Sequence, residues 1–175
     1  FGMTPVRPLR SLIIQAENDA GDVREAVQGV RRGLPHLSAQ WPDLKQRVSI
    51  VSKADCTGTK FLAYAESMVK AVQPDLLWID NVQAYLDGDV CSQQQVMAFL
   101  NPLRALALET GVAVQLIHHT GKSITGNRTA LDWSYIGNGS SQLTNWARAV
   151  MVLMPDDEEN YGVFNLRAAK RGTRA

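Results

Sequence analysis

Short apolar runs of strand length alternate with longer segments of helical period along the chain, and this alternation limits the possible folds more than any other feature. Continuous apolar strands without a polar face are typical of a parallel sheet buried on both sides. Parallel strands need crossover connections, which are usually helices. The alternation therefore predicts an α/β fold, with a mostly parallel sheet flanked by helices. At 175 residues, the chain is long enough for one domain of this kind.

Local signals give the expected bounds of the elements. Strands are expected at residues 11–16, 47–51, 75–80, 112–118, 150–154 and 163–169, and helices at residues 19–32, 59–72, 93–109 and 142–147. Residues 36–46 are polar apart from the region of Trp41 and Pro42, and we expect them to form a connection. The last two strands are joined by an acidic turn, which predicts a C-terminal antiparallel hairpin.

Composition and charge narrow the function classes. Lys and Arg number 18 and Asp and Glu 17, so the net charge of +1 gives no global argument for a nucleic-acid partner. Cys56 and Cys91 lie far apart without a C-x-x-C motif, which argues against a zinc site or a disulfide framework and favours buried, reduced thiols in a cytoplasmic protein. No apolar run approaches the roughly 20 residues that span a bilayer, so we expect no membrane partner.

Several polar residues directly follow predicted strands. In open α/β sheets, ligands bind beyond the carboxyl ends of the strands. If the strands are parallel neighbours, their polar end residues converge on a single edge. The residues in question are Glu17, Asp80, His118, His119, Lys122, Lys170 and Arg171.

These residue types match the needs of nucleotide hydrolysis. Phosphoryl transfer to water needs a magnesium ion on the phosphates, a carboxylate that orients the water, and donors or cations for the charge on the γ-phosphate. Residues 76–80 (LLWID) fit the Walker B pattern, in which the acid holds magnesium. Taken by itself, this pattern is also explained by a buried strand whose final Asp caps the following turn. Glu17 alone is equally well explained as a helix N-terminal acid. The adjacent His118 and His119 cannot both point into a core, and they lack the spacing of a helical zinc site.

The order of these motifs resembles that of RecA-like ATPases related to the RepA-type hexameric replicative helicases of plasmids and phages, with the DnaB and KaiC proteins as more distant relatives. The resemblance implies ATP and Mg²⁺ as cofactors and a homo-oligomeric, hexameric ring. It implies that Glu17 is the catalytic glutamate and that Asp80, with Asn81 beside it, binds the cofactor and holds magnesium through water. His118 or His119 would sense the γ-phosphate.

The resemblance continues after the histidine pair. Residues 139–143 (GSSQL), followed by Trp146-Ala147-Arg148, are similar to the Gly-Ser-Ser and Ala-Arg stretch of the same family. Between the two motifs the family carries a DNA-facing loop, here residues 121–138, and basic plus aromatic side chains suit single-stranded DNA. An ordinary surface loop is the alternative. The implied DNA-binding residues are Lys122, Arg128, Trp133 and Tyr135.

Lys170 and Arg171 are implied to be basic fingers that reach the γ-phosphate of a neighbouring subunit. The family more often separates its Lys and Arg by one residue, whereas these two are adjacent, so the sequence does not assign the finger to either. The alternative is a solvated basic strand end.

The sequence contains no G-x-x-x-x-G-K-[ST] loop, whose backbone amides and Lys cradle phosphates. Gly121-Lys122-Ser123 matches only the end of that motif. Residue 1 is Phe and residues 170–175 are basic, so both ends are expected to be cuts. Residues 1–175 are then expected to be one RecA-like ATPase domain fragment without its Walker A strand and helix, inactive alone and part of a helicase motor when intact. The alternative is a degenerate RecA fold that binds DNA or supports assembly without turnover.

Overall fold

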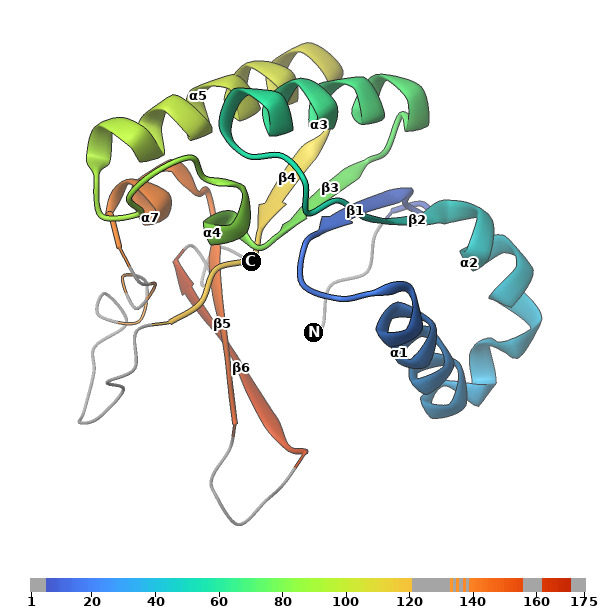
Figure 1. Cartoon of the computed structure of the whole chain (residues 1–175). Helices are drawn as coiled ribbons and strands as arrows, with labels where there is room; N and C mark the ends of the chain where they lie inside the picture. Colours follow the sequence, from blue (N-terminus) through green and yellow to red (C-terminus); the bar gives the residue numbers. More distant parts are fainter. Residues whose placement is uncertain are drawn as a thin grey trace.

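The computed structural model describes residues 6–120, 133, 135, 137, 139–155 and 162–170. Its main sheet has four strands in the order β2-β1-β3-β4, and all neighbouring pairs are parallel. A two-stranded antiparallel hairpin, β5-β6, forms a separate sheet (Figure 1). The predicted α/β architecture and the C-terminal hairpin are therefore confirmed. The strands are β1 (Ser11–Gln15), β2 (Val48–Ser52), β3 (Leu76–Asp80), β4 (Ala113–Leu116), β5 (Val150–Pro155) and β6 (Phe164–Lys170).

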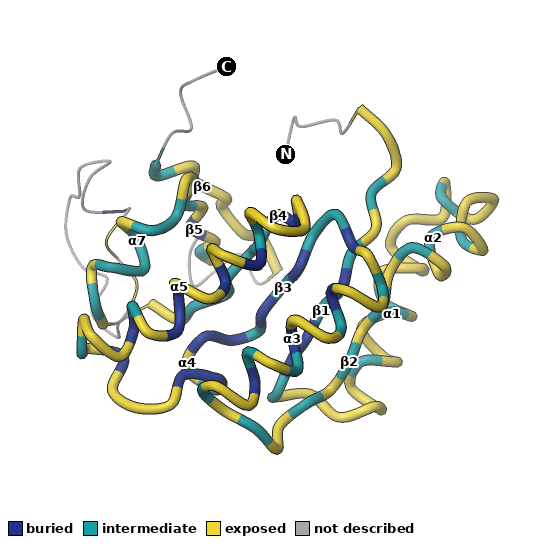
Figure 2. The backbone as a smooth tube through the Cα atoms, turned by 90° about the horizontal axis from the view of Figure 1, so that it is seen from above, coloured by how far each residue is buried: buried dark blue, intermediate teal, exposed yellow. Residues whose placement is uncertain are grey.

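The helices lie on both sides of the main sheet (Figure 1). They are α1 (Ala20–Gly33), the 3₁₀ helix η1 (Pro35–Gln40), α2 (Trp41–Arg47), α3 (Gly58–Val72), α4 (Val82–Tyr85), α5 (Gln93–Thr110) and α7 (Gln142–Trp146). Two of them, α3 and α5, run side by side over one face of the sheet, whereas α1 and α2 lie on its other side, near β2 (Figures 1 and 2). None of the helices in the described part of the chain is long and apolar enough to cross a membrane.

The core lies between the main sheet and the pair α3 and α5. Alternate side chains of the two central strands face it, and Leu12, Ile14, Leu77 and Ile79 are fully buried there. Figure 2 shows the buried positions concentrated along these strands and along the facing sides of the two helices. Each aliphatic side chain buried in this way stabilises the fold by about 1.5–3 kcal/mol. The other face of the sheet is only half-buried, as Ile13 and Trp78 show.

Local sequence signals explain where the helices begin and end. Asp19 caps α1: its Oδ1 accepts hydrogen bonds from the Gly21 and Asp22 amides at 2.6 and 2.9 Å, and the Asp22 carboxylate accepts one from the Asp19 amide at 3.1 Å. Ser92 caps α5, which ends at Gly111 with φ of 76°. Such a positive φ is the backbone conformation that glycine adopts without steric cost.

The prediction of a connection at residues 36–46 is wrong, because η1 and α2 occupy this segment. Pro35 and Pro42 lie at the first turns of these helices, where a missing N–H costs nothing. An ion pair between Asp43 and Arg47, one helical turn apart, links Arg47 Nε to Asp43 Oδ2 at 2.6 Å. The expectation that both cysteines are buried is wrong, because Cys91 is exposed in the polar turn before α5 and Cys56 is only partly buried.

The hairpin is attached to the rest of the chain at the end of β6, where Lys170 donates hydrogen bonds to carbonyls of α7. Its outer face carries exposed apolar side chains, with Leu153 at 61% and Phe164 at 59% exposure. Within the described residues, β4 pairs only with β3, and β5 pairs only with β6. One edge of β4 and one edge of β5 therefore carry backbone groups without a ladder partner in this part of the chain.

Candidate functional site

The parallel register brings three strand ends together. Ile14 pairs with Ile79 and Gln15 with Asp80, and the Ala16 amide then donates to the Asp80 carbonyl at 3.0 Å. On the other side of β3, the Val82 amide donates to the Ile117 carbonyl at 2.9 Å. The ladder thus continues beyond the strands and aligns residues 16–17, 80–82 and 117–119 at one edge.

The segment that carries Glu17 is fixed by Gln15, a polar residue that is 3% exposed in an otherwise apolar strand. Gln15 Oε1 accepts from the Asn18 amide at 2.7 Å, and Gln15 Nε2 donates to the Asn18 carbonyl at 2.7 Å. The same Nε2 donates to Ser52 Oγ on β2 at 2.5 Å. Because both sides of the Gln15 amide hold residue 18, the turn that presents Glu17 is tied to the sheet.

Asn81 lies at the centre of the site and is only 2% exposed. Its Oδ1 accepts a hydrogen bond from the Ala84 amide at 2.9 Å and so caps α4. Its Nδ2 donates to Glu17 Oε1 and lies 3.0 Å from His119 Nε2. One buried amide thus contacts side chains from residues 64 and 38 positions away in the sequence.

The two groups above Asn81 are accessible to solvent. The side chains of Glu17 and His119 are 53% and 59% exposed, and Glu17 Oε1 lies 3.5 Å from His119 Nε2. Beside them, burial raises the pKa of Asp80, the negative charge of Glu17 raises it further, and His119 opposes the shift. The edge therefore holds a water-accessible carboxylate, an imidazole and a second carboxylate whose charge is unfavourable in the absence of a cation.

This donor set fits magnesium better than zinc. Magnesium keeps several waters and uses one or two carboxylates together with substrate phosphates. Within the described ranges no group of three or more His, Cys, Asp or Glu side chains is arranged to hold a metal ion. Asp80 is the carboxylate suited to such an ion.

The structure separates the two predicted histidines. His119 contacts Asn81, whereas the His118 ring lies against Gly137, where an added Cβ would come within 2.8 Å of His118 Cδ2. Gly137 also forms an antiparallel bridge with Thr120. Of the pair, His119 is therefore the one that the structure brings to Glu17.

Lys170 does not lie at this edge, so the expected convergence of Lys170 with Glu17 is not found. Its strand, β6, belongs to the separate hairpin. Lys170 Nζ instead donates to the carbonyls of Thr144 and Ala147 at 2.7 Å each, and a third carbonyl lies at 3.4 Å. These groups form the C-terminal end of α7, where a cation is favoured. Arg171 lies outside the described residues.

Two of the four predicted DNA-binding residues, Lys122 and Arg128, lie outside the described residues. Trp133 is 9% exposed, and the Arg167 guanidinium lies 4.8 Å from the centre of its ring. Tyr135 is 44% exposed, and its hydroxyl donates to Asn145 Oδ1 at 2.8 Å. Trp133 therefore packs within its own chain, and Tyr135 is accessible.

The predicted Gly-Ser-Ser motif forms a turn against the loop before α5. Gly139 has φ of 107°, and an added Cβ would lie 2.7 Å from the Val90 carbonyl oxygen. The next amide, that of Ser140, donates to the same oxygen at 2.8 Å. Glycine is required here by both the positive φ and the close approach.

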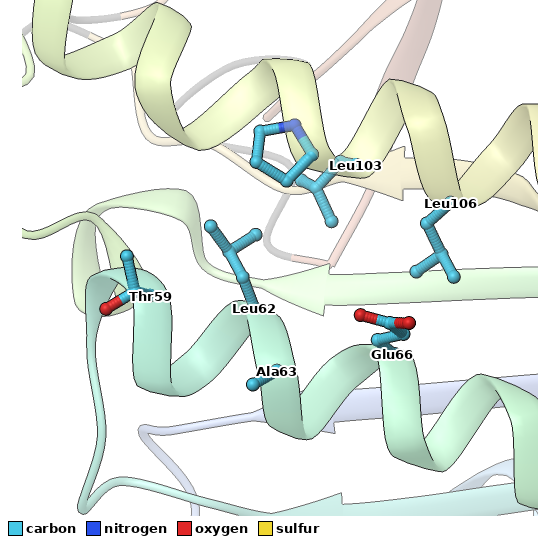
Figure 3. A pocket seen from close by; sticks show the side chains of 7 residues that line it. Thr59, Leu62, Ala63, Glu66, Leu103 and Leu106 are labelled. Atoms are coloured by element: carbon cyan, nitrogen blue, oxygen red, sulfur yellow. The ribbon is translucent and has the colours of Figure 1, made fainter.

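The described residues line two clefts, and one of them adjoins the edge that holds Asp80. A groove of about 260 Å³ between α3 and α5 is lined mainly by aliphatic side chains, including Leu62, Leu103 and Leu106, with Glu66 as its carboxylate (Figure 3). Glu66, the charged side chain in this lining, forms an ion pair with Lys70. A second cleft of about 180 Å³ lies between α1 and the sheet and is lined by residues that include Asn18 and Asp80. The second cleft is the one that adjoins the candidate site.

The sequence analysis missed Gln15 and the position of Asn81 between Glu17 and His119. A polar residue inside the apolar run SLIIQA was the available signal for Gln15.

The family model described as an AAA domain matches residues 1–124 of the chain. A search of curated proteins found no match.

Proposed function

The chain belongs to the AAA domain family of ATPase-type domains, and from its site we propose that it is the hydrolytic part of a RepA-like replicative DNA helicase or a related phage or plasmid replication ATPase. The observation that carries the proposal is the contact of Glu17 and His119 with one buried amide, beside Asp80, at the carboxyl edge of a parallel sheet. Hydrolysis of a phosphoanhydride needs a base for the attacking water, a cation site and a hydrogen-bond donor to the γ-phosphate. Glu17, Asp80 and His119, the side chains proposed for these three roles, lie near one another at this edge.

Glu17 is the proposed catalytic base. Its carboxylate is half exposed and so is accessible to a water molecule, while the Asn81 amide holds Oε1. A carboxylate fixed in this way orients the water and accepts its proton as the water attacks the γ-phosphorus. The tie of residue 18 to Gln15 limits the movement of the turn that presents this base.

Asp80 is the proposed magnesium-binding residue, acting through water. Burial and the charge of Glu17 raise its pKa, so a divalent cation beside it would relieve an unfavourable charge. ATP would supply the phosphoryl group, and the magnesium ion bound to it would neutralise the charge that develops on this group.

His119 is the proposed γ-phosphate sensor. The fingers proposed to act on a neighbouring subunit are Lys170 and Arg171. For Lys170 to take that role, its ammonium must leave the carbonyls at the end of α7. Residues 121–138 are the proposed contact with single-stranded DNA, in a homo-hexameric ring.

The phosphate-binding loop is proposed to come from a strand that pairs with the open edge of β4. Such a strand would be parallel to β4, and the loop that follows it would reach the edge that holds Asp80. This loop is necessary to the proposal because the 175 residues contain no G-x-x-x-x-G-K-[ST] motif.

The test compares phosphate release by the 175-residue chain and by the chain extended at its N-terminus with a P-loop strand and helix, both with Mg²⁺ and ATP. We expect turnover only in the extended protein, and a fall of roughly 100-fold or more in Glu17→Gln. Glu25→Gln, a matched change on the exposed side of α1, should leave turnover unchanged. Full turnover in Glu17→Gln would refute the role of Glu17.

A second candidate is a degenerate ATPase fold that binds DNA or supports assembly without turnover, and the lack of a phosphate-loop motif in the sequence favours it. Fluorescence anisotropy with a labelled single-stranded oligonucleotide separates the two. DNA binding with no turnover in either protein would refute the ATPase proposal and support the binding module.

A further inference from the structure

Asn81 lies buried beneath two exposed groups that the chemistry uses, and it contacts both. We infer that Asn81 is a positioning residue that fixes the Glu17 carboxylate and holds the His119 imidazole in the tautomer protonated at Nδ1. The inference rests on the proposed function, because it gives Glu17 and His119 their roles. It assigns to Asn81 a task different from the cofactor contact predicted from sequence.

The orientation of the Asn81 amide follows from its contact with α4. A backbone N–H only donates, so the atom that the Ala84 amide meets at 2.9 Å must be the carbonyl oxygen of Asn81. The NH₂ group then faces the opposite way, toward Glu17 and His119. Tyr85, the last residue of α4, is fully buried, so this short helix is anchored in the core.

The tautomer of His119 follows from the same orientation. Nδ2 of Asn81 carries two protons and has no lone pair to offer, and it directs one toward Glu17 Oε1 and the other toward His119 Nε2 at 3.0 Å. A donor opposite Nε2 requires a lone pair on Nε2, so the ring proton resides on Nδ1. His119 then offers Nδ1–H as its donor to a phosphate oxygen. The buried Asn81 amide thus fixes the position of the Glu17 carboxylate and the tautomer of the His119 imidazole at the same time.

Asn81→Asp is the sharpest perturbation because it retains the oxygen that caps α4 and removes both amide protons. Asn81→Ser gives an independent check, since Ser also caps helices well but is too short to reach both groups. Asn101→Asp is the matched control, with the same chemical change at an exposed position of α5.

The first readout is the ¹⁵N spectrum of the histidine rings in the 175-residue chain, recorded at an alkaline pH where the ring signals no longer change with pH and the rings are neutral. His119→Gln assigns the His119 signals. We expect an unprotonated Nε2 in the native chain and in Asn101→Asp, and a shift of the proton toward Nε2 in Asn81→Asp and Asn81→Ser. A protonated Nε2 in the native chain would overturn the inference, and so would an unchanged tautomer in both Asn81 variants.

The second readout is turnover in the extended protein that carries a P-loop. We expect Asn81→Asp to lower kcat roughly 100-fold with little change in KM for ATP, since misplacement of a reacting group by about 1 Å has this effect. Full turnover in Glu17→Gln would refute the proposed function. The His119 tautomer would then still test whether Asn81 donates to His119 Nε2. Loss of turnover in Glu17→Gln with an unchanged kcat in Asn81→Asp would refute the positioning role.

Discussion

Tyr85→Phe is predicted to stabilise the protein. Tyr85 is fully buried, and its ring stacks on Phe61 with 3.8 Å between the ring centroids. Its hydroxyl is also buried and has no hydrogen-bond partner among the residues that the structure describes. Burial raises the pKa of Tyr85 above its ordinary value, so the hydroxyl stays neutral. The substitution removes this hydroxyl and leaves the ring and its stacking in place.

The expected gain comes from the hydroxyl alone. A buried polar group without a partner costs about 1–3 kcal/mol. Deleting it also removes a few contacts of roughly 0.1–0.2 kcal/mol each. The free energy of unfolding should therefore rise by about 1–2 kcal/mol, and Tm by roughly 2–8 °C for a chain of this length.

Urea unfolding followed by circular dichroism measures this change, provided that the m value stays constant. Tyr135→Phe is the control, because its hydroxyl donates to Asn145 Oδ1 at 2.8 Å. That variant should lose about 0.5–1.5 kcal/mol, so the same chemical change has opposite signs at the two positions. A Tyr85→Phe protein that is less stable than the native chain by 1 kcal/mol or more, on the scale of a lost hydrogen bond, would show that the buried hydroxyl has a partner.

Three further predictions concern charged groups. The raised folded-state pKa of Asp80 means that its negative charge is less favourable in the folded chain than in the unfolded chain. Asp80→Asn should therefore raise Tm without Mg²⁺ by less than about 4 °C, and a lower Tm in a thermal melt would contradict this. Hydrogen bonds from Arg7 and the Arg10 amide lower the pKa of Asp75 from 3.8 to about 2, so its stabilisation is present above pH 3.8 and lost as the pH falls through about 2. Asp75→Asn should therefore have a lower free energy of unfolding in urea than the native chain, and this difference should shrink as the pH falls between these values. A difference that stays constant with pH would refute the argument. Lys170→Met removes a cation from the end of α7 and should cost about 1–3 kcal/mol in the same assay, whereas no loss would show that these contacts are not formed in solution.

The main sheet could be predicted because its strands are short, apolar and separated by amphipathic segments. Leu77 and Ile79 alternate with half-buried neighbours, but the run is apolar enough to be recognised without the structure. The segment at residues 36–46 could not be predicted, because Pro35 and Pro42 suggest a break. A proline also suits the first turn of a helix, and only the following residues decide between the two.

The candidate site was predictable to the extent that strand ends determine it. Glu17 and Asp80 follow paired parallel strands, so the topology alone brings them to one edge. The choice of His119 over His118 depends on which way each side chain points, which adjacent positions do not reveal. The place of Lys170 depends on which sheet the hairpin joins, and the turn that predicts a hairpin carries no information on that point.

The proposed role of Lys170 as a finger competes with its observed contacts at the end of α7. A two-stranded sheet is marginally stable alone, and this one is fastened to the rest of the chain by Lys170 and by Arg167 over Trp133. If Lys170 reaches a neighbouring subunit's phosphate, it must give up the carbonyls of α7, so that movement would loosen the hairpin. The release cost is of the same order as the stability lost in Lys170→Met, about 1–3 kcal/mol. A large loss of stability in Lys170→Met would therefore argue against Lys170 as the finger.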